Sequence, residues 1–143
     1  MRFHTLTVAA LVAVCVALAG GCAKESRDTP EACMKAFDRY MLGAQTHKAS
    51  TLFALSKWGE DNSTDWSTYA PSQRDLIVKS LRSEKAGQLG AMQERYAKAG
   101  YKITSLQVTG EWASLTLAGA GDPIPVRLYK EKSGWGIYSF GSL

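Results

Sequence analysis

The residue types that catalyse reactions are sparse in this sequence, and their spacing does not suit acid–base chemistry. Its two histidines are His4, in an apolar N-terminal stretch, and His47, at the start of a predicted helix. A histidine in the latter position more often caps a helix or faces solvent than acts as a base. The predicted strands of the C-terminal third contain no acidic residue, because Glu111 and Asp122 fall in turns. A general base would have to come from a helix or a loop, so we predict no catalytic residue and no enzymatic activity.

One short segment has the alternating oxygen ligands of a calcium loop but lacks the rest of that motif. Asp61, Ser63 and Asp65 have the spacing, whereas Trp66 stands where the loop needs glycine and Ser72 where it needs glutamate. The sequence has no Walker loop, dinucleotide glycine fingerprint, nucleophile elbow or metal-ligand cluster. We therefore predict no metal and no cofactor, and we interpret this segment as a solvated loop.

The first residues have the order of a secretion signal. Arg2 precedes an apolar segment at residues 6–18, and the small residues 19–21 lead to Cys22. A helix needs about 20 apolar residues to cross a bilayer, so this segment is too short to persist as a transmembrane helix. We expect it to be removed during export.

The residues around the expected cleavage site, Leu18-Ala19-Gly20-Gly21-Cys22, resemble the lipobox of bacterial lipoproteins. The resemblance implies that residues 1–21 are a lipoprotein signal peptide and that diacylglycerol is attached to the Cys22 thiol. One acyl chain binds a membrane only marginally, but the several chains of a lipoprotein would hold the protein there permanently. The alternative is ordinary signal cleavage near Gly21, with Cys22 as a free thiol.

The residues after Cys22 predict where the protein is held. Residues 22–28 comprise the lipidated cysteine and a short polar tether, which reaches at most about 20 Å. The residue after the cysteine is Ala23, whereas lipoproteins retained in the inner membrane of enteric bacteria have Asp at that position. Ala23 therefore resembles the pattern of lipoproteins that are sorted to the outer membrane. We expect a domain in the cell envelope that faces the periplasm, close to the bilayer, on the outer rather than the inner membrane.

The remaining chain suits a single domain. Residues 29–143 can bury roughly two-thirds of their unfolded surface around one core. The full sequence has a net charge of +4 and its basic residues are dispersed, so nucleic-acid binding is not predicted. If Cys22 is acylated, Cys33 has no disulfide partner, and its place on the apolar side of a predicted helix favours a small buried residue over a reactive thiol.

The first half of this domain has helical periodicity. Thr29 and Pro30 can cap and start an amphipathic helix that ends near Gly43. A second short helix is predicted at residues 47–56, and a polar loop at residues 57–69.

A long helix and a set of strands follow. The helix is predicted from Pro71 to Gly100, interrupted or kinked at Gly87 and Gly90. Alternating patterns joined by short turns then predict an antiparallel four-stranded meander, at residues 101–109, 112–118, 124–130 and 135–140. Helices first and strands after is the order of an α+β domain, in which the helices cover one face of the sheet.

Several short motifs carry a family resemblance: Thr29-Pro30-Glu31 and Ala36-Phe37 in the first helix, Lys48-Ala49 in the second, and Gly134-Trp135-Gly136-Ile137-Tyr138-Ser139-Phe140 in the last strand. Together they resemble the nuclear transport factor 2 like (NTF2-like) superfamily, and within it small bacterial lipoproteins of unknown function. The resemblance implies a curved sheet wrapped on helices around a conical cavity, like a half barrel. The superfamily contains isomerases, dehydratases and domains without known activity, so the fold does not choose among functions.

The two faces of the predicted sheet differ in composition. One face is apolar and is assigned to the core, with Ala113, Leu115, Leu117, Ile124, Val126, Leu128, Trp135 and Ile137. The opposite face carries Trp112, Arg127, Tyr129, Tyr138 and Phe140. Aromatic residues and arginine are enriched at protein interfaces. The alternative is that these residues form cross-strand packing pairs on a partly exposed sheet, or that coiling of the sheet turns some of them inward.

Two hypotheses about function follow. The first is a lipid-anchored envelope domain without catalysis that binds a protein partner, or a second copy of itself, through the outer face of the sheet. The second is a carrier that holds a small apolar ligand in the cone, with an aromatic lining formed by Tyr40, Trp58, Trp66, Tyr69 and Tyr96. An enzyme is the third choice.

Replacement of the lipobox cysteine tests the anchor. Cys22→Ser should leave the longer precursor or a poorly exported protein, because lipid transfer to that thiol precedes cleavage in the pathway that the sequence resembles. Metabolic labelling with palmitate should mark the wild-type protein and not the variant. An unlabelled wild-type protein that is released in soluble form would contradict the anchor.

Overall fold

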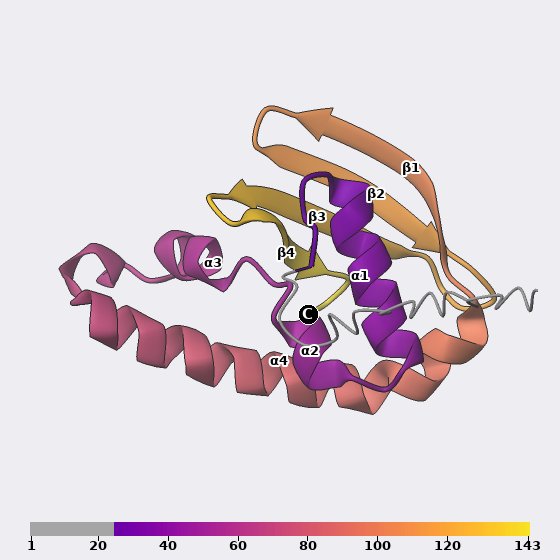
Figure 1. The fold of residues 1–143 in the computed structure, drawn as a ribbon, viewed down its shortest axis with the longest axis horizontal. Coiled ribbons are helices and arrows are strands. Elements are labelled where there is room, and N and C mark those ends of the chain that lie inside the picture. Colours follow the sequence, from indigo (N-terminus) through magenta and orange to yellow (C-terminus); the bar gives the residue numbers. More distant parts are fainter. Residues whose placement is uncertain (1–24) are drawn as a thin grey trace, which may run out of the picture.

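The computed structural model describes residues 25–143, and the expected signal peptide and Cys22 lie outside the described residues. The described chain forms helices followed by strands, the α+β order predicted from the sequence (Figure 1). The elements are α1 Pro30–Leu42, α2 Thr46–Ser50, α3 Leu55–Asn62, the 3-10 helix η1 Trp66–Thr68, α4 Pro71–Ala99, β1 Lys102–Thr109, β2 Trp112–Ala118, β3 Ile124–Glu131 and β4 Gly134–Phe140. None of these helices is both long and apolar enough to span a bilayer.

Helix α1 begins where the capping residues predicted it. The Ala32 N–H donates to the Thr29 side-chain hydroxyl over 3.1 Å, and Pro30 occupies the first turn, where no amide hydrogen is needed. The apolar positions Cys33, Phe37 and Met41 recur on one side of the helix and are fully buried. This face forms one wall of the core.

The predictions for residues 47–56 and 57–69 were wrong, because tertiary contacts divide this segment differently. Helix α2 ends at Ser50, and the chain then pairs with β4: the Ala54 N–H donates to the Ile137 carbonyl over 2.7 Å, and the Ile137 N–H donates to the Leu52 carbonyl over 2.8 Å. A helix cannot run through residues whose backbone groups bond to a strand. Helix α3 then starts at Leu55 and occupies residues 57–62 of the predicted loop, and the 3-10 helix η1 occupies Trp66–Thr68.

Helix α4 is continuous, so the expected interruption at Gly87 and Gly90 does not occur. Each glycine costs about 1 kcal/mol relative to alanine in a helix. The adjacent Ala86 and Leu89 are buried in the packed side of the helix, which offsets that cost. The helix ends at Gly100, whose φ of 61° is the left-handed conformation predicted for this cap.

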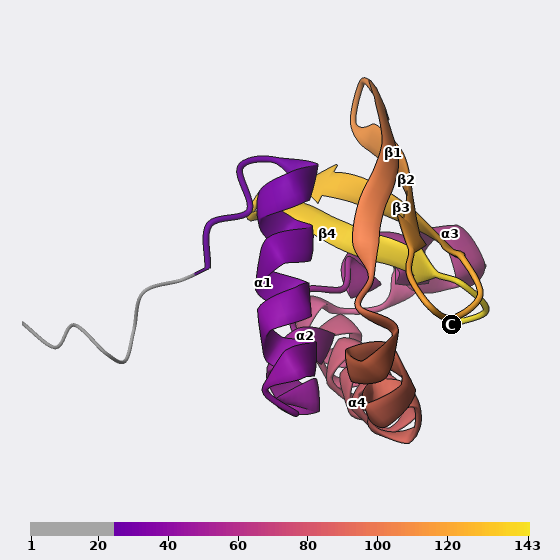
Figure 2. The same cartoon turned by 90° about the vertical axis from the view of Figure 1, so that its right-hand side faces the viewer.

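The strands form the predicted meander, with order β1-β2-β3-β4 and antiparallel pairing throughout. Helices α1, α2 and α4 gather on one side of the sheet, whereas the β1–β2 hairpin projects past them (Figure 2). The inner face carries the predicted apolar residues, of which all but the half-buried Ile124 are buried: Ala113, Leu115, Leu117, Val126, Leu128, Trp135 and Ile137.

The prediction that Phe140 lies on the outer face was wrong, because an irregularity in β4 reverses the alternation of its side chains. Arg127 pairs with Ser139, but the next residue, Leu128, pairs with Ile137, so Tyr138 is an extra residue in the strand. Phe140 therefore turns inward, with only 1% of its surface exposed and its ring centroid 4.9 Å from that of Phe37.

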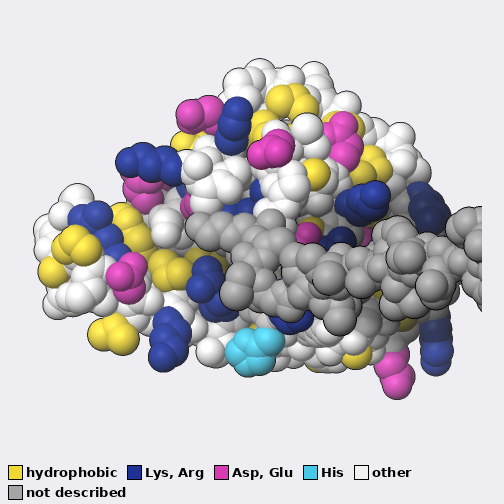
Figure 3. All heavy atoms as spheres, viewed as in Figure 1, with side chains coloured by type: hydrophobic (Ala, Val, Ile, Leu, Met, Phe, Trp, Pro, Cys, Tyr) yellow, Lys and Arg dark blue, Asp and Glu magenta, His cyan; other side chains and the backbone are white. Residues whose placement is uncertain are grey.

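Charge on the surface is mixed rather than segregated. Figure 3 shows lysine and arginine side chains interspersed with aspartate and glutamate over the visible face. The described side chains visible on this face form no single-signed stripe of the kind typical of nucleic-acid binding.

Truncation of the large aromatic residue in β4 tests the assignment of the inner face. Trp135→Ala should lower the free energy of unfolding by about 3 to 5 kcal/mol, the range for removal of a buried large aromatic side chain. Trp112→Ala is the matched control, because Trp112 is only half-buried on the opposite face, and it should cost about 1 kcal/mol. Urea denaturation of both variants measures the difference, and equal losses would mean that the two faces are assigned wrongly.

Candidate functional site

Four side chains on the outer face of the sheet lie against one another, and we call them the outer cluster: Trp112, Arg127, Tyr129 and Tyr138. The Trp112 ring lies 4.8 Å from that of its cross-strand partner Tyr129 and 5.0 Å from that of Tyr138. The Arg127 guanidinium lies 4.5 Å from the centroid of the Trp112 ring and 5.6 Å from that of Tyr138. The structure thus brings together four of the five residues predicted for this face, and their role as an interface stays a prediction.

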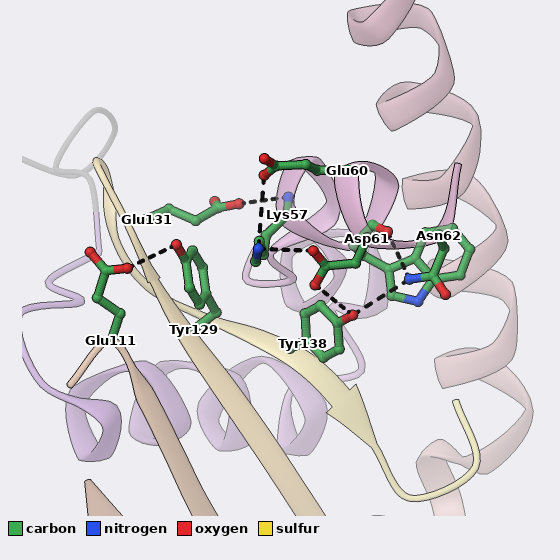
Figure 4. A network of polar contacts seen from close by, with 9 residues as sticks. Lys57, Glu60, Asp61, Asn62, Glu111, Tyr129, Glu131 and Tyr138 are labelled. Atoms are coloured by element: carbon green, nitrogen blue, oxygen red, sulfur yellow. Dashed lines mark hydrogen bonds and ion pairs between the residues drawn. The ribbon is translucent and has the colours of Figure 1, made fainter. Parts of the chain in front are cut away.

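Charged side chains of α3 border the outer cluster (Figure 4). The Tyr138 hydroxyl donates to Asp61 Oδ2 over 2.9 Å, and the other oxygen of Asp61 lies 2.8 Å from Lys57 Nζ. The same ammonium group lies 5.1 Å from the centroid of the Tyr129 ring. On the far side of the cluster, the Tyr129 hydroxyl donates to Glu111 Oε2 over 3.0 Å. The Tyr129 and Tyr138 rings are therefore held in place by hydrogen bonds at their hydroxyl groups.

The ionisation of these groups follows from their partners. The hydrogen bond from Lys57, and after it the bond from Tyr138, lowers the pKa of Asp61. The hydrogen bond to Glu111 raises the pKa of Tyr129, whereas burial is the main cause of the raised pKa of Tyr138. The carboxylate stays charged and the phenols stay protonated at neutral pH, so the network holds positions rather than supplying a base. The ionised Asp61 carboxylate stabilises the fold at pH values above the pKa that this carboxyl has in the unfolded chain. This stabilisation is lost as the pH falls through the lower pKa that the carboxyl has in the folded chain.

A polar groove of about 1070 Å³ adjoins the outer cluster. It lies between the α3–η1 segment on one side and the β1–β2 and β3–β4 turns on the other, and it shares Lys57, Glu111 and Tyr129 with the site just described. Its lining contains no aliphatic residue and otherwise consists of Ser56, Glu60, Ser63, Thr64, Trp66, Ser67, Arg74, Gly110, Lys130, Glu131, Lys132 and Ser133. Such a lining offers charged and hydrogen-bonding groups beside the rings of Trp66 and Tyr129.

The residues predicted to line the cone do not meet in one cavity. Tyr96 is a core residue that packs against Phe37 and Phe140 and donates its hydroxyl to Asp38. Trp66 lies in the polar groove, with the Tyr69 ring 6.5 Å away.

The other two predicted cone residues are also apart. Tyr40 donates to Glu25 on the outside of α1, and Trp58 is half-buried on α3. The interior expected of a cone is instead occupied by packed side chains, with the Phe37 ring in contact with three other aromatic rings.

Sequence reasoning missed Lys57, Asp61 and Glu111 as part of the site. The sequence pattern predicts a loop for Lys57 and Asp61, and it offers Asp61 only as a calcium ligand. Their i,i+4 spacing is the signal of an ion pair on a helix and could have indicated α3. Among residues 25–143, no group of three histidine, cysteine, aspartate or glutamate side chains is placed to hold a metal ion.

The fold has a counterpart among solved structures. The chain is similar to a protein from Campylobacter jejuni whose 2.00 Å crystal structure is described as that of a candidate NTF2-like transpeptidase, with a TM-score of 0.50. The likeness covers 78% of this chain and 99% of that chain at 14% sequence identity, a level that shows the fold alone. No family model and no curated protein matches the sequence. The chain thus has the NTF2-like fold that the sequence resemblance implied.

The buried thiol gives a test of how closed the core is. Cys33 is free and fully buried, and desolvation raises the pKa of its thiol to about 12 from an ordinary 9.0. In the native protein at pH 8, Cys33 should not react with a thiol reagent, because the thiolate is the reactive form and the side chain is shielded. The same protein in guanidinium chloride serves as the positive control. Rapid labelling of the native protein would contradict the packing described for α1.

Proposed function

We propose that this protein is a lipid-anchored domain of the bacterial cell envelope that binds a protein partner through the outer cluster. The observation that carries the proposal is the contact of three aromatic rings and one guanidinium on an uncovered sheet face. Tryptophan, tyrosine and arginine are the residue types that most often dominate binding energy at protein interfaces.

The fixed geometry of the outer cluster supports this proposal. A flexible surface loses conformational entropy on binding, at about 0.5 to 1.5 kcal/mol for each side chain that becomes immobile. Tyr129 and Tyr138 are already held by Glu111 and Asp61, and Arg127 is already stacked on Trp112. A partner would therefore meet an ordered apolar centre with a charged border, the arrangement common at transient interfaces.

The attachment of the tether supports the orientation implied by the anchor. The Arg27 carbonyl accepts from the Trp135 N–H over 2.8 Å, and its guanidinium donates to the Ser133 hydroxyl over 2.7 Å. The end of the expected tether is thus fastened to the β3–β4 turn. An anchor at Cys22 would hold that turn, and the mouth of the polar groove beside it, near the bilayer.

A role without catalysis suits the groups present. The transpeptidase description belongs to the Campylobacter jejuni protein. A transpeptidase transfers an acyl group, and this reaction needs an activated nucleophile beside a base. Here Cys33 is enclosed by the core, and His47 is exposed on α2. The carrier alternative loses support because Tyr96, one of its expected lining residues, fills the interior.

Removal of two rings from the outer cluster tests the proposal. In the full chain, a photo-crosslinking side chain at Ser114, exposed on the same face and paired with Arg127, should give discrete adducts with an envelope protein. Tyr129→Ala with Tyr138→Ala should reduce these adducts at least tenfold. That loss corresponds to about 1.4 kcal/mol, a modest value for two interface anchors.

Matched controls separate binding from folding. Tyr40→Ala with Tyr69→Ala removes two half-buried tyrosines outside the outer cluster and should leave the adducts unchanged. A photo-crosslinker at Leu76, which is 67% exposed on α4, should give none of the same adducts. Absence of adducts at Ser114, or adducts that survive the double substitution at Tyr129 and Tyr138, would contradict the proposal.

A further inference from the structure

One edge strand of the sheet is covered by other segments of the chain, and the other edge strand is open. The β4 edge is covered, because residues 52–54 and the Arg27 carbonyl bond to its backbone. The β1 edge is the other end of the sheet, and no backbone hydrogen bond joins it to a described segment other than β2. No described element lies beyond β1 in Figure 1. Its outward N–H and C=O groups are thus available to a further strand.

The β1 edge also lacks two of the usual protections against pairing along most of its length. Proteins commonly guard an open edge with charged residues or proline, yet neither occurs between Ile103 and Thr109. The strand instead presents an apolar stripe on its inner face, in which Ile103 is 38% exposed, Val108 is 50% exposed and Leu106 is half-buried. The described helices thus leave Ile103 and Val108 exposed, whereas Leu106 packs partly against the core.

A bulge in β1 makes the apolar stripe symmetric about Leu106. Ile103 pairs with Leu117 and Ser105 pairs with Thr116, so Thr104 is an extra residue. With Thr104 left out of the count, Ile103 and Val108 each stand two positions from Leu106, and all three lie opposite inner-face residues of β2. A second, antiparallel β1 can therefore align Leu106 with its own copy and each Ile103 with the other copy's Val108.

The positions of the charged residues are compatible with this antiparallel alignment. Lys102, the one charged residue of β1, falls opposite Thr109 of the other copy, directly before the turn that carries Glu111. Both side chains are exposed, and opposite charges in such diagonal positions attract. The same alignment places no like charges together along the strand.

From these observations we infer that β1 pairs with β1 of a second copy about a twofold axis at Leu106, which joins two four-stranded sheets into one. The pairing buries the apolar stripe of both copies and satisfies the open backbone groups. It also sets two outer clusters on one continuous face. This inference does not rest on the proposed function, because the outer cluster takes no part in the pairing.

Cysteine pairs test this register in the full chain within bacterial membranes. After mild oxidation, Ile103→Cys chains mixed with Val108→Cys chains should give a disulfide-linked dimer, because directly opposed residues lie within disulfide reach. Val108→Cys alone should give none, since the two copies of residue 108 would be about 13 Å apart along the strands. Leu106→Cys alone should also cross-link. Cys33 does not interfere, because it is buried.

Two controls decide between this register and other associations. Ser80→Cys, exposed on α4, should stay monomeric, and Tyr129→Ala with Tyr138→Ala should leave the Ile103–Val108 cross-link intact. Strong self-linkage of Val108→Cys, or failure of the mixed pair, would overturn the inference whatever happens at the outer cluster.

A charge placed on the edge gives an independent measurement. The purified full-length protein in detergent should sediment as a dimer and Val108→Lys as a monomer with an unchanged circular dichroism spectrum. Leu42→Lys is the matched control, because Leu42 is similarly exposed, at 54%, on α1, and it should remain dimeric. A monomeric wild-type protein, or a dimer that survives Val108→Lys, would exclude pairing through β1.

Discussion

The backbone pairing between residues 52–54 and β4 joins the helical half of the chain to the sheet, and other features depend on it. It ends α2, and it starts α3 at Leu55 beside the sheet. The approach is close: a Cβ added at Gly136 would lie 3.1 Å from the Ala54 backbone nitrogen, so a larger residue would push the two segments apart. Because α3 is fixed here, Lys57 and Asp61 reach Tyr129 and Tyr138. The same pairing closes one sheet edge and leaves β1 as the open one.

Packing of the core and exposure of the outer cluster are coupled through the extra residue in β4. Tyr138 faces outward and completes the outer cluster, whereas Phe140, two residues later, closes the core against Phe37 and Tyr96. A regular strand would turn residues 138 and 140 to the same face. The irregularity therefore supplies an aromatic ring to both sides of the sheet, which leaves the interior filled and the site on the outside. This arrangement favours binding of a partner at the outer face of the sheet over binding of a ligand in the interior.

Much of the fold was predictable because its signals are local. The cap at Thr29, the left-handed Gly100 and the alternating strands each depend on neighbouring residues, and all appear where the sequence predicted them. Four residues of the outer cluster were predictable for the same reason, since alternation places them on one face wherever the strands are regular. The charged border was not predictable, because Lys57 and Asp61 meet the tyrosines only through the packing of α3 on β4.

The sequence alone determined the order of helices and strands, the apolar face of the sheet and the aromatic character of the opposite face, because periodicity and capping act over a few residues. Only the tertiary structure decided that residues 52–54 leave the helical path, that Phe140 turns inward and that Tyr96 fills the interior rather than lining a cavity. Each of these depends on contacts between segments distant in sequence. A backbone hydrogen bond or a filled space in the core can override the preference of a short stretch, and no local pattern records that competition.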